Sequence, residues 1–349
     1  MRLGLSCGWW GLGNDEEHLA LVQRAEELGV HVVWASEAYG TDAVTVLAWI
    51  GARTSRIRLG AGVLQIPGRT PAMTAMTAAG LNSLSGGRFD LGLGVSGPQV
   101  SEGWHGVRFA KPLERTREYV EIVRLALGRQ RVEFHGRHYE LPLPDGPGKA
   151  LRTTAAPSPH RVPIYLAAVG PKNLELAGEI ADGWLGLFLS PEFTGEQVAS
   201  IRAGLARSED PDRPFDLDAT VPLSVQDDVS AAADVVRPYT ALYVGGMGSR
   251  TQNFYNALAV RMGYEEAAGQ VQDLYLAGNH RDAAAAVPQQ FIDDTCLLGP
   301  RDRIAERLQR YADAGMSTVT LAPYGRTIEE RIAALETGVA AAEQAGILS

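Results

Sequence analysis

The chain has 349 residues, of which 45% are hydrophobic, and a formal net charge of −9; it can therefore bury a large core, and it lacks the positive surface that nucleic acids and polybasic membrane contacts require. Its two cysteines are too few for a disulfide framework or a cysteine metal site, and the apolar run after Met1 is too short for a signal peptide. We therefore expect a cytoplasmic protein that acts on a small molecule and has neither nucleic acid nor membrane as a partner.

The first part of the chain alternates between two patterns. Apolar runs bounded by turn residues predict strands, and apolar residues spaced three or four positions apart predict helices. Asn14 and Glu17 form a capping-box signature at the start of the first helix. The elements expected up to residue 127 are strands at 2–7, 31–35, 57–64 and 88–95, and helices at 14–28, 41–52, 71–84 and 112–127.

Two insertions interrupt the second part. Residues 131–141 alternate as in a hairpin and 142–159 are rich in proline and glycine, so an insertion is expected at about 98–160. A second insertion at about 228–292 is alanine-rich and helical, with a break at 244–249. The remaining expected elements are strands at 162–168, 183–189, 218–225 and 317–322, and helices from 171, at 194–207, at 301–314 and at the end of the chain.

A repeated unit indicates how these elements assemble. Residues 24–34 resemble 310–320, and 177–184 echo both; each is a helix end, a glycine and a strand of almost continuous apolar residues. Such strands are typical of parallel sheets buried on both faces. Eight of them alternating with helices predict one (β/α)8 TIM barrel over residues 1–349, with its active site on the loops after the strands. A doubly wound sheet with a helical second domain is the alternative, but the loop at 8–13 imitates a dinucleotide fingerprint only loosely.

The third strand carries glycines where they normally weaken a strand. Gly60 and Gly62 lie inside it, and the chain leaves through Pro67 and Gly68 into a helix with Pro71 at its first position. The glycines indicate either a cofactor lying against residues 61–63 or a kink required only for packing. The stretch alone leaves both interpretations open.

If the barrel is right, aromatic and polar side chains ring its mouth. No spacing typical of metal ligands and no Ser-His-Asp arrangement appears, so we expect no metal site and no acyl transfer. Residues 169–173 offer backbone N–H groups and a lysine at a helix start, which suits a phosphate or is an ordinary turn. The residues expected at the mouth are Trp9, Trp10, Glu37, Tyr39, Arg69, Ser96, Gln99, His105, Lys172, Asn173 and Tyr324.

Three groups of motifs resemble the bacterial-luciferase-like superfamily, and specifically its coenzyme F420-dependent oxidoreductases. They are residues 60–64, 85–89 together with 92–94, and 167–172. The longer combination of 62–67 with 94–99 is more specific than a lone glycine motif. The resemblance extends from residue 1 to about 190 and again over 293–321, and it is looser between these ranges.

The resemblance implies a barrel that binds a deazaflavin at the strand ends and transfers a hydride between it and a small organic substrate. It also implies a bulge with a non-proline cis peptide at Gly62–Val63. Glu37 and His105 are the candidate catalytic residues; the alternatives are a cofactor hydrogen-bond partner for Glu37 and a solvated loop residue for His105. The implied cofactor contacts are Glu37, Gly62, Val63, Val95, Ser96, Gly97, Val169 and Gly170 at the ring and Lys172 and Asn173 near the phosphate of the tail. From the aromatic residues expected around the mouth, the predicted substrate pocket is Trp9, Trp10, Tyr39 and Trp104.

Two alternatives remain within the superfamily. One is an FMN-dependent two-component monooxygenase, which reacts reduced flavin with oxygen, and the other is a non-catalytic flavin-binding relative. Relatives that oxidise glucose 6-phosphate place a histidine where this chain has Ala38, which disfavours a sugar phosphate. The superfamily also implies a homodimer.

Overall fold

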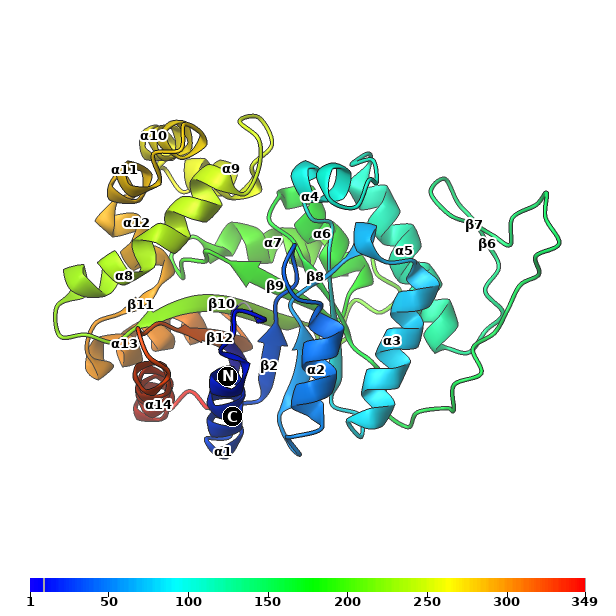
Figure 1. The fold of residues 1–349 in the computed structure, drawn as a ribbon, viewed down its shortest axis with the longest axis horizontal. Coiled ribbons are helices and arrows are strands. Elements are labelled where there is room, and N and C mark those ends of the chain that lie inside the picture. The colour runs from blue at the N-terminus through cyan, green and yellow to red at the C-terminus, as the bar shows by residue number, and fades with distance from the viewer. Residues whose placement is uncertain (9, 349) are drawn as a thin grey trace.

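The computed structural model describes residues 1–8 and 10–348. Within this part of the chain, eight parallel strands form a closed barrel, so the predicted TIM barrel is confirmed and the doubly wound alternative is wrong (Figure 1). Pairing of the sixth strand with the seventh closes the ring. The barrel strands in spatial order are β1 (Arg2–Ser6), β2 (Val32–Ala35), β3 (Arg58–Ala61), β5 (Phe89–Gly94), β8 (Ile164–Ala167), β9 (Gly183–Leu187), β10 (Asp216–Ser224) and β12 (Thr318–Pro323).

The third strand is split, as its glycines suggested. β3 ends at Ala61, and β4 (Leu64–Gln65) resumes the pairing with β5 after a gap of two residues. The peptide bond between Gly62 and Val63 is cis, so this expectation is confirmed. A further short strand, β11 (Leu297–Leu298), pairs with the end of β10 and was not predicted.

Helices cover the outside of the barrel. α3 and α5 begin at prolines and have the predicted bounds. The capping box predicted for α1 is wrong, because Asn14 makes no side-chain cap and Asp15 instead accepts a hydrogen bond from the N–H of Gly11 at 2.7 Å. The covering helices are α1 (Asp15–Glu27), α2 (Ala43–Gly51), α3 (Pro71–Leu84), α5 (Pro112–Leu127), α6 (Pro171–Ile180), α7 (Thr194–Leu205), α13 (Arg301–Asp313) and α14 (Ile328–Gln344).

Both predicted excursions are present. The first holds α4 (Pro98–Gly103) and the hairpin β6 (Phe134–His135) and β7 (Glu140–Leu141), which extends away from the barrel (Figure 1). The second has its own apolar core. Because α4 follows β5 and α8 follows β10, both excursions begin at the carboxyl end of the barrel. The second excursion contains α8 (Val229–Ala241), a π-helical turn (Leu242–Gly246), α9 (Phe254–Arg261), α10 (Glu265–Leu276), α11 (His280–Ala285) and α12 (Gln289–Thr295).

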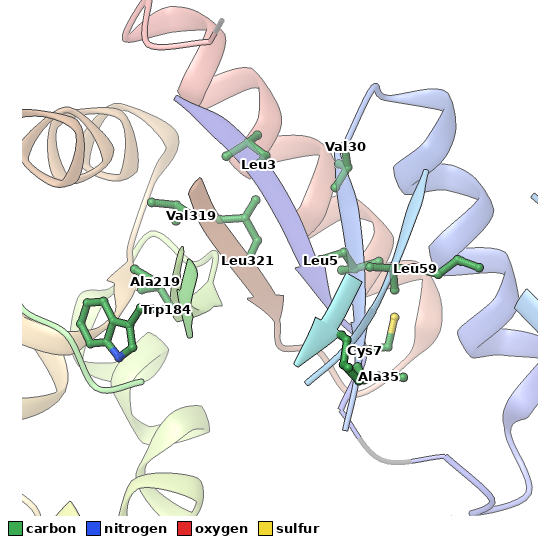
Figure 2. Packing of buried hydrophobic residues seen from close by; sticks show 14 of the residues in the cluster. Leu3, Leu5, Cys7, Val30, Ala35, Leu59, Trp184, Ala219, Val319 and Leu321 are labelled. Carbon is green, nitrogen blue, oxygen red and sulfur yellow. The ribbon is translucent and has the colours of Figure 1, made fainter. Parts of the chain in front are cut away.

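Strand alternation separates two environments. Outward-facing side chains such as Leu5 and Leu321 join the main core between strands and helices (Figure 2). The inward positions are less typical of this fold, where branched aliphatic layers dominate. They hold a small cluster around Trp34 and Tyr165, and polar groups that include the ion pair of Arg58 with Asp90 at 2.5 Å.

The two ends of the described chain meet below the barrel. The amino group of Met1 donates a hydrogen bond to the carbonyl oxygen of Ile347 at 2.5 Å (Figure 1). Among the described helices, none is both long enough and apolar enough to span a membrane.

Candidate functional site

Trp34 occupies the barrel beneath the split third strand. A Cβ added at Gly60 would lie 2.2 Å from Cε3 of Trp34, and one added at Gly62 would lie 3.1 Å from Cβ of Trp34. On β5, a Cβ at Gly92 would lie 1.9 Å from the carbonyl oxygen of Ala61. Close packing within the protein therefore explains why Gly60 and Gly92 are glycines. For Gly60 this is the packing interpretation, one of the two that the sequence left open.

Two other glycines face open space at the strand ends. No heavy atom lies within 4 Å of a Cβ built at Gly170, and the nearest to one built at Gly97 is Oε1 of Gln99 at 3.7 Å. Each glycine is the N-cap of a helix, Gly97 of α4 and Gly170 of α6. Ser96, which lies between β5 and Gly97, has a φ of 58°, in the left-handed region. These two glycines leave an open space at the strand ends that side chains at the same positions would fill. We call this space the cradle; it suits a flat ring that contacts the backbone.

Glu37, which follows β2, has a carboxylate that contacts several neighbouring segments. Its carboxylate accepts hydrogen bonds from the N–H of Ala43 at 3.1 Å and of Gln65 at 3.3 Å, and it pairs with Arg69 at 3.0 Å. The side chain is 8% exposed, and Arg69 also pairs with Asp42. The carboxylate thus joins the end of β2 to α2 and β4, and its contacts fit a positioning residue better than a proton relay.

Gln65 brings the two predicted catalytic residues into one network, and sequence reasoning missed it. Its side-chain Nε2 donates to the carbonyl oxygen of Glu37 at 3.3 Å, and its Oε1 lies 2.7 Å from Nε2 of His105. With the amide oriented in this way, Nε2 of His105 carries the proton and Nδ1 is the acceptor. His105 also packs over Gly68, where a Cβ would lie 3.0 Å from its Cε1.

A buried carboxyl group, that of Asp218, holds Trp34 in place from inside the barrel. Nε1 of Trp34 donates to Asp218 at 2.9 Å, and the hydroxyl of Thr320 donates to the other oxygen at 2.7 Å. Burial raises the pKa of Asp218 to about 7, assisted by the charge of Asp216 and opposed by these two hydrogen bonds and by Arg2. No sequence pattern marks this contact, because its members lie on three separate strands.

The raised pKa of Asp218 predicts a pH-dependent effect of Asp218→Asn on stability. An unfolded Asp ionises near pH 3.8, whereas the folded one keeps its proton to about pH 7. The folded state therefore binds more protons in this window, and the contribution of Asp218 is present below about pH 4 and lost as the pH rises toward 7. The loss is on the order of 4 kcal/mol.

Urea unfolding of both proteins at pH 4.5, 5.5 and 7 measures this effect. We expect Asp218→Asn to gain stability relative to the wild type as the pH rises. Burial lowers the pKa of His31 to about 4, so His31 contributes stability that is lost as the pH falls below 6.5, but this contribution is common to both proteins. Parallel pH profiles would contradict a raised pKa at Asp218.

The remaining predicted residues are dispersed. Trp10 is buried, with its ring centroid 4.9 Å from that of His18 and 6.0 Å from that of Trp49, and Trp9 lies outside the described residues. Tyr39 and Trp104 are 59% and 65% exposed at the carboxyl end of the barrel. The structure therefore brings Tyr39 and Trp104 to the mouth and directs Trp10 into the core.

The predicted tail-binding residues lie around the start of α6. Lys172 is exposed and borders a cleft of about 330 Å³ between α5 and α6, on the outer side of the barrel. Nδ2 of Asn173 lies 3.5 Å from the carbonyl oxygen of Ala167. Nη2 of Arg261, on α9, donates to the carbonyl oxygen of Val169 at 3.1 Å. Arg261 is a second cation at this helix start that the sequence did not reveal. Val95 borders a small hollow with Ile66 and Pro67.

One group of potential metal ligands occurs among the described residues, Glu114, Glu118 and His138. The carboxylate of Glu118 accepts hydrogen bonds from the backbone N–H of Arg137, His138 and Tyr139 at 2.9, 2.8 and 3.1 Å. Glu114 pairs with Arg137 at 3.0 Å. These contacts tie the β6–β7 hairpin to α5, so the group lies between a covering helix and the first excursion and not at the mouth.

Tyrosines from the second excursion form one side of the mouth. Tyr239, Tyr243 and Tyr255 cluster with Tyr324, which follows β12, and with Phe188, which follows β9. Only Tyr324 was expected here. The four-residue spacing of Tyr239 and Tyr243 was the available signal, since it places both side chains on one helix face.

Comparisons with known proteins identify related chains. A family model for luciferase-like monooxygenases matches residues 11–318. A protein of Mycobacterium tuberculosis named as a coenzyme F420-dependent oxidoreductase is 43% identical, and the match covers 92% of this chain and 94% of that protein. A 5,10-methylenetetrahydromethanopterin reductase of Archaeoglobus fulgidus is 29% identical, over 85% of this chain and 86% of the reductase.

Solved structures share the fold. A coenzyme F420-dependent tetrahydromethanopterin reductase of Methanopyrus kandleri matches 97% of each chain with a TM-score of 0.77 and 23% identity. An F420-dependent secondary alcohol dehydrogenase in complex with an F420–acetone adduct matches 97% of this chain and 98% of its own, with a TM-score of 0.78 and 18% identity.

Proposed function

Because the chain belongs to the luciferase-like family, we propose that it is a coenzyme F420-dependent oxidoreductase that transfers a hydride between the deazaflavin and a small organic substrate. The observation that carries this proposal is the 43% identity, over almost the whole length of both chains, to a protein named for that cofactor. When bound, the deazaflavin supplies two-electron hydride chemistry, because a carbon replaces the flavin nitrogen that supports one-electron and oxygen chemistry.

The cradle at the strand ends fits the cofactor ring. Gly97 and Gly170 leave open space where side chains would stand, and a Cβ built at Gly62 would lie 3.1 Å from Cβ of Trp34. These residues hold and orient the ring, and orientation is the main catalytic contribution that a rigid barrel makes to hydride transfer.

Glu37, Gln65 and His105 support one side of this cradle. Glu37 fixes the position of Gln65, and the side-chain oxygen of Gln65 holds the proton of His105 at Nε2. Nδ1 of His105 is then available to accept a proton. In this proposal His105 is the catalytic member of the network, and Glu37 is a positioning residue.

Arg261 and Lys172 are the proposed anchors of the phosphate-bearing tail. Replacing either by alanine is expected to weaken deazaflavin binding by roughly 1–3 kcal/mol, the range for loss of a charge-assisted hydrogen bond. The affinity should also fall with added salt, and less steeply in the variants. Fluorescence titration of the cofactor at several salt concentrations measures both effects. The control is Lys149→Ala, which replaces an exposed lysine on the first excursion. If the Arg261 and Lys172 variants bind the deazaflavin as tightly as this control, neither residue contacts the tail.

The homodimer implied by the resemblance is also part of the proposal. The outer face of α3 carries no charged residue, and Met73, Met76 and Leu84 on it are 54%, 63% and 84% exposed. A two-fold axis places such a face against itself without like-charge repulsion. Met76→Glu is therefore expected to convert a dimer to a monomer in light scattering. Leu151→Glu, at a leucine 67% exposed on the first excursion, should leave the dimer intact; a monomeric wild type would contradict the proposal.

Oxygen consumption distinguishes this function from the FMN monooxygenase of the same family. The protein is supplied with reduced FMN from a flavin reductase, or with the reduced deazaflavin, in air. We expect no consumption of oxygen above the reductase background with FMN. Oxygen uptake that depends on the protein would replace the proposed function with a monooxygenase.

A further inference from the structure

The turn of the hairpin β6–β7 wraps around the carboxylate of Glu118 on α5. This hairpin lies beside α5 and extends away from the barrel, and residues 143–149, which follow it, are all exposed (Figure 1). Each of its strands is only two residues long, and a two-stranded hairpin alone is marginally stable in water. The contacts with Glu118 therefore have a large share in holding the hairpin to the helix.

The carboxylate of Glu118 has one hydrogen-bonding position left. A carboxylate offers about four lone-pair sites, two on each oxygen. Oε2 accepts from the backbone N–H of His138 and of Tyr139 at 2.8 and 3.1 Å, and Oε1 accepts from the N–H of Arg137 at 2.9 Å. A Cβ built at Gly136 would lie 2.5 Å from Oε2, so this approach of backbone to carboxylate requires glycine. The three N–H groups fix the direction of the carboxylate, and a lone pair of Oε1 remains.

His138 brings a ring nitrogen to the same place. Its Nε2 is shielded from solvent and has no hydrogen-bond partner among the described residues. Such an atom costs about 1–3 kcal/mol if it stays unpaired, and in native proteins it commonly binds a water or an ion. One ring nitrogen of His138 and one carboxylate oxygen each of Glu114 and Glu118 all lie within 4.8 Å of one another. The histidine therefore stands beside two carboxylates.

Glu114 lies one turn before Glu118 on the same face of α5. Its carboxylate pairs with Nε of Arg137 at 3.0 Å and with Nζ of Lys111 at 3.6 Å. Both pairs lie at the surface, since the side chains of Arg137 and Lys111 are 63% and 55% exposed. Exposed ion pairs contribute about 0–1 kcal/mol each. A metal ion can therefore displace these two cations from Glu114 at little cost.

The donor set suits zinc better than magnesium or calcium. Mg²⁺ and Ca²⁺ take about six or more oxygen ligands, whereas Zn²⁺ binds imidazole nitrogen together with carboxylate oxygen and usually has four ligands. Tetrahedral ligands at zinc distances lie about 3.3–3.6 Å from one another. The three ligand atoms, which lie within 4.8 Å, reach this spacing by a small rotation of the partly exposed Glu114 side chain.

We propose that Glu114, Glu118 and His138 bind one Zn²⁺ ion, with water as the fourth ligand, and that the ion links the hairpin β6–β7 to α5. Glu118 binds through Oε1, and Glu114 exchanges Arg137 and Lys111 for the metal. The site lies outside the barrel, so it does not depend on the proposed function. The sequence did not reveal this set because His138 lies 20 positions after Glu118.

Isothermal titration of the full-length, chelator-treated protein with zinc chloride tests the site. We expect one Zn²⁺ per chain with a dissociation constant in the micromolar range or below, and no measurable binding of Mg²⁺ or Ca²⁺ at the same concentrations. Loss of an outer-shell partner costs about 10–100-fold in metal affinity, so loss of a ligand in His138→Ala should cost roughly a hundredfold or more. Glu114→Gln should also weaken binding. Arg137→Gln should strengthen it, because it removes a competing cation.

His135→Ala is the matched control on the same hairpin. His135 is 63% exposed and also has two carboxylates nearby, Glu140 at 2.5 Å and Glu133 at 3.6 Å. Its replacement should leave Zn²⁺ affinity unchanged. Zn²⁺ should also slow tryptic cleavage after Lys149 and Arg152 in the wild type and not in His138→Ala.

Circular dichroism of each variant checks that the fold is kept. Glu118 is left unchanged, because its buried carboxylate holds the hairpin turn. The inference is overturned if the wild type binds no Zn²⁺ saturably, or if His138→Ala and Glu114→Gln both keep the wild-type affinity. It is also overturned if His135→Ala loses as much affinity as His138→Ala, since the ion would then lie elsewhere on the hairpin.

Discussion

Replacing Trp34 by alanine is expected to lower the free energy of unfolding by about 3–5 kcal/mol, the range for truncation of a buried aromatic side chain. Trp34 is 4% exposed, and its ring packs edge-on against Tyr165 with centroids 5.2 Å apart. Truncation leaves a cavity under Gly60 and removes one of the two hydrogen-bond donors of the buried Asp218. The folded fraction should also bind the cofactor less tightly, because the backbone at Gly60 and Gly62 loses the side chain on which it packs.

Urea unfolding followed by circular dichroism measures this effect, and Trp104→Ala is the matched control. Trp104 is 65% exposed, so its removal should change stability by less than about 0.5 kcal/mol. Equal losses in the two variants would show that Trp34 does not support the barrel interior in the way described.

Gly170→Val is expected to lower deazaflavin affinity at least a hundredfold while leaving the fold intact. A side chain at this position enters open space, since no heavy atom lies within 4 Å of its Cβ. The backbone, with φ of −82°, accepts any residue, and loss of a glycine N-cap costs only about 1 kcal/mol. The valine side chain would therefore occupy the space of the cofactor without colliding with other protein atoms.

Gly195→Val is the control for this variant. Gly195 lies in the first turn of α7, and a Cβ there also meets no atom within 4 Å. Thermal unfolding and cofactor titration of both variants separate stability from binding. Unchanged affinity in Gly170→Val would exclude the cradle as the cofactor site. Gly62→Val is a less informative variant, because its Cβ would lie 3.1 Å from Cβ of Trp34 and so would change packing as well.

The sequence predicts the barrel well because its signals are local. Glycine after a helix and an apolar run in the following strand recur along the chain, and prolines at the first positions of α3 and α5 mark their starts. Barrel-strand bounds agree to within two residues except at the split third strand. The capping box at Asn14 failed: Asn14 makes no side-chain cap, and the neighbouring Asp15 accepts a hydrogen bond from Gly11 in the preceding loop.

The site was predicted less completely because its contacts join distant segments. The alternation of β2 does not reveal that Trp34 fills the barrel or that its N–H contacts Asp218, 184 positions away. A loop tryptophan such as Trp10 gives no indication of where its ring points, and it lies in the core. The cluster of Tyr239, Tyr243 and Tyr255 escaped prediction because it lies in the second excursion, where the family resemblance is looser.

The most direct test of the central claim is an equilibrium titration of the purified protein with coenzyme F420 and, in parallel, with FMN, followed by the absorbance and fluorescence of each cofactor. The account predicts saturable binding of F420 at one site per chain, with a lower Kd than for FMN. Tight binding of FMN without measurable binding of F420 would contradict it.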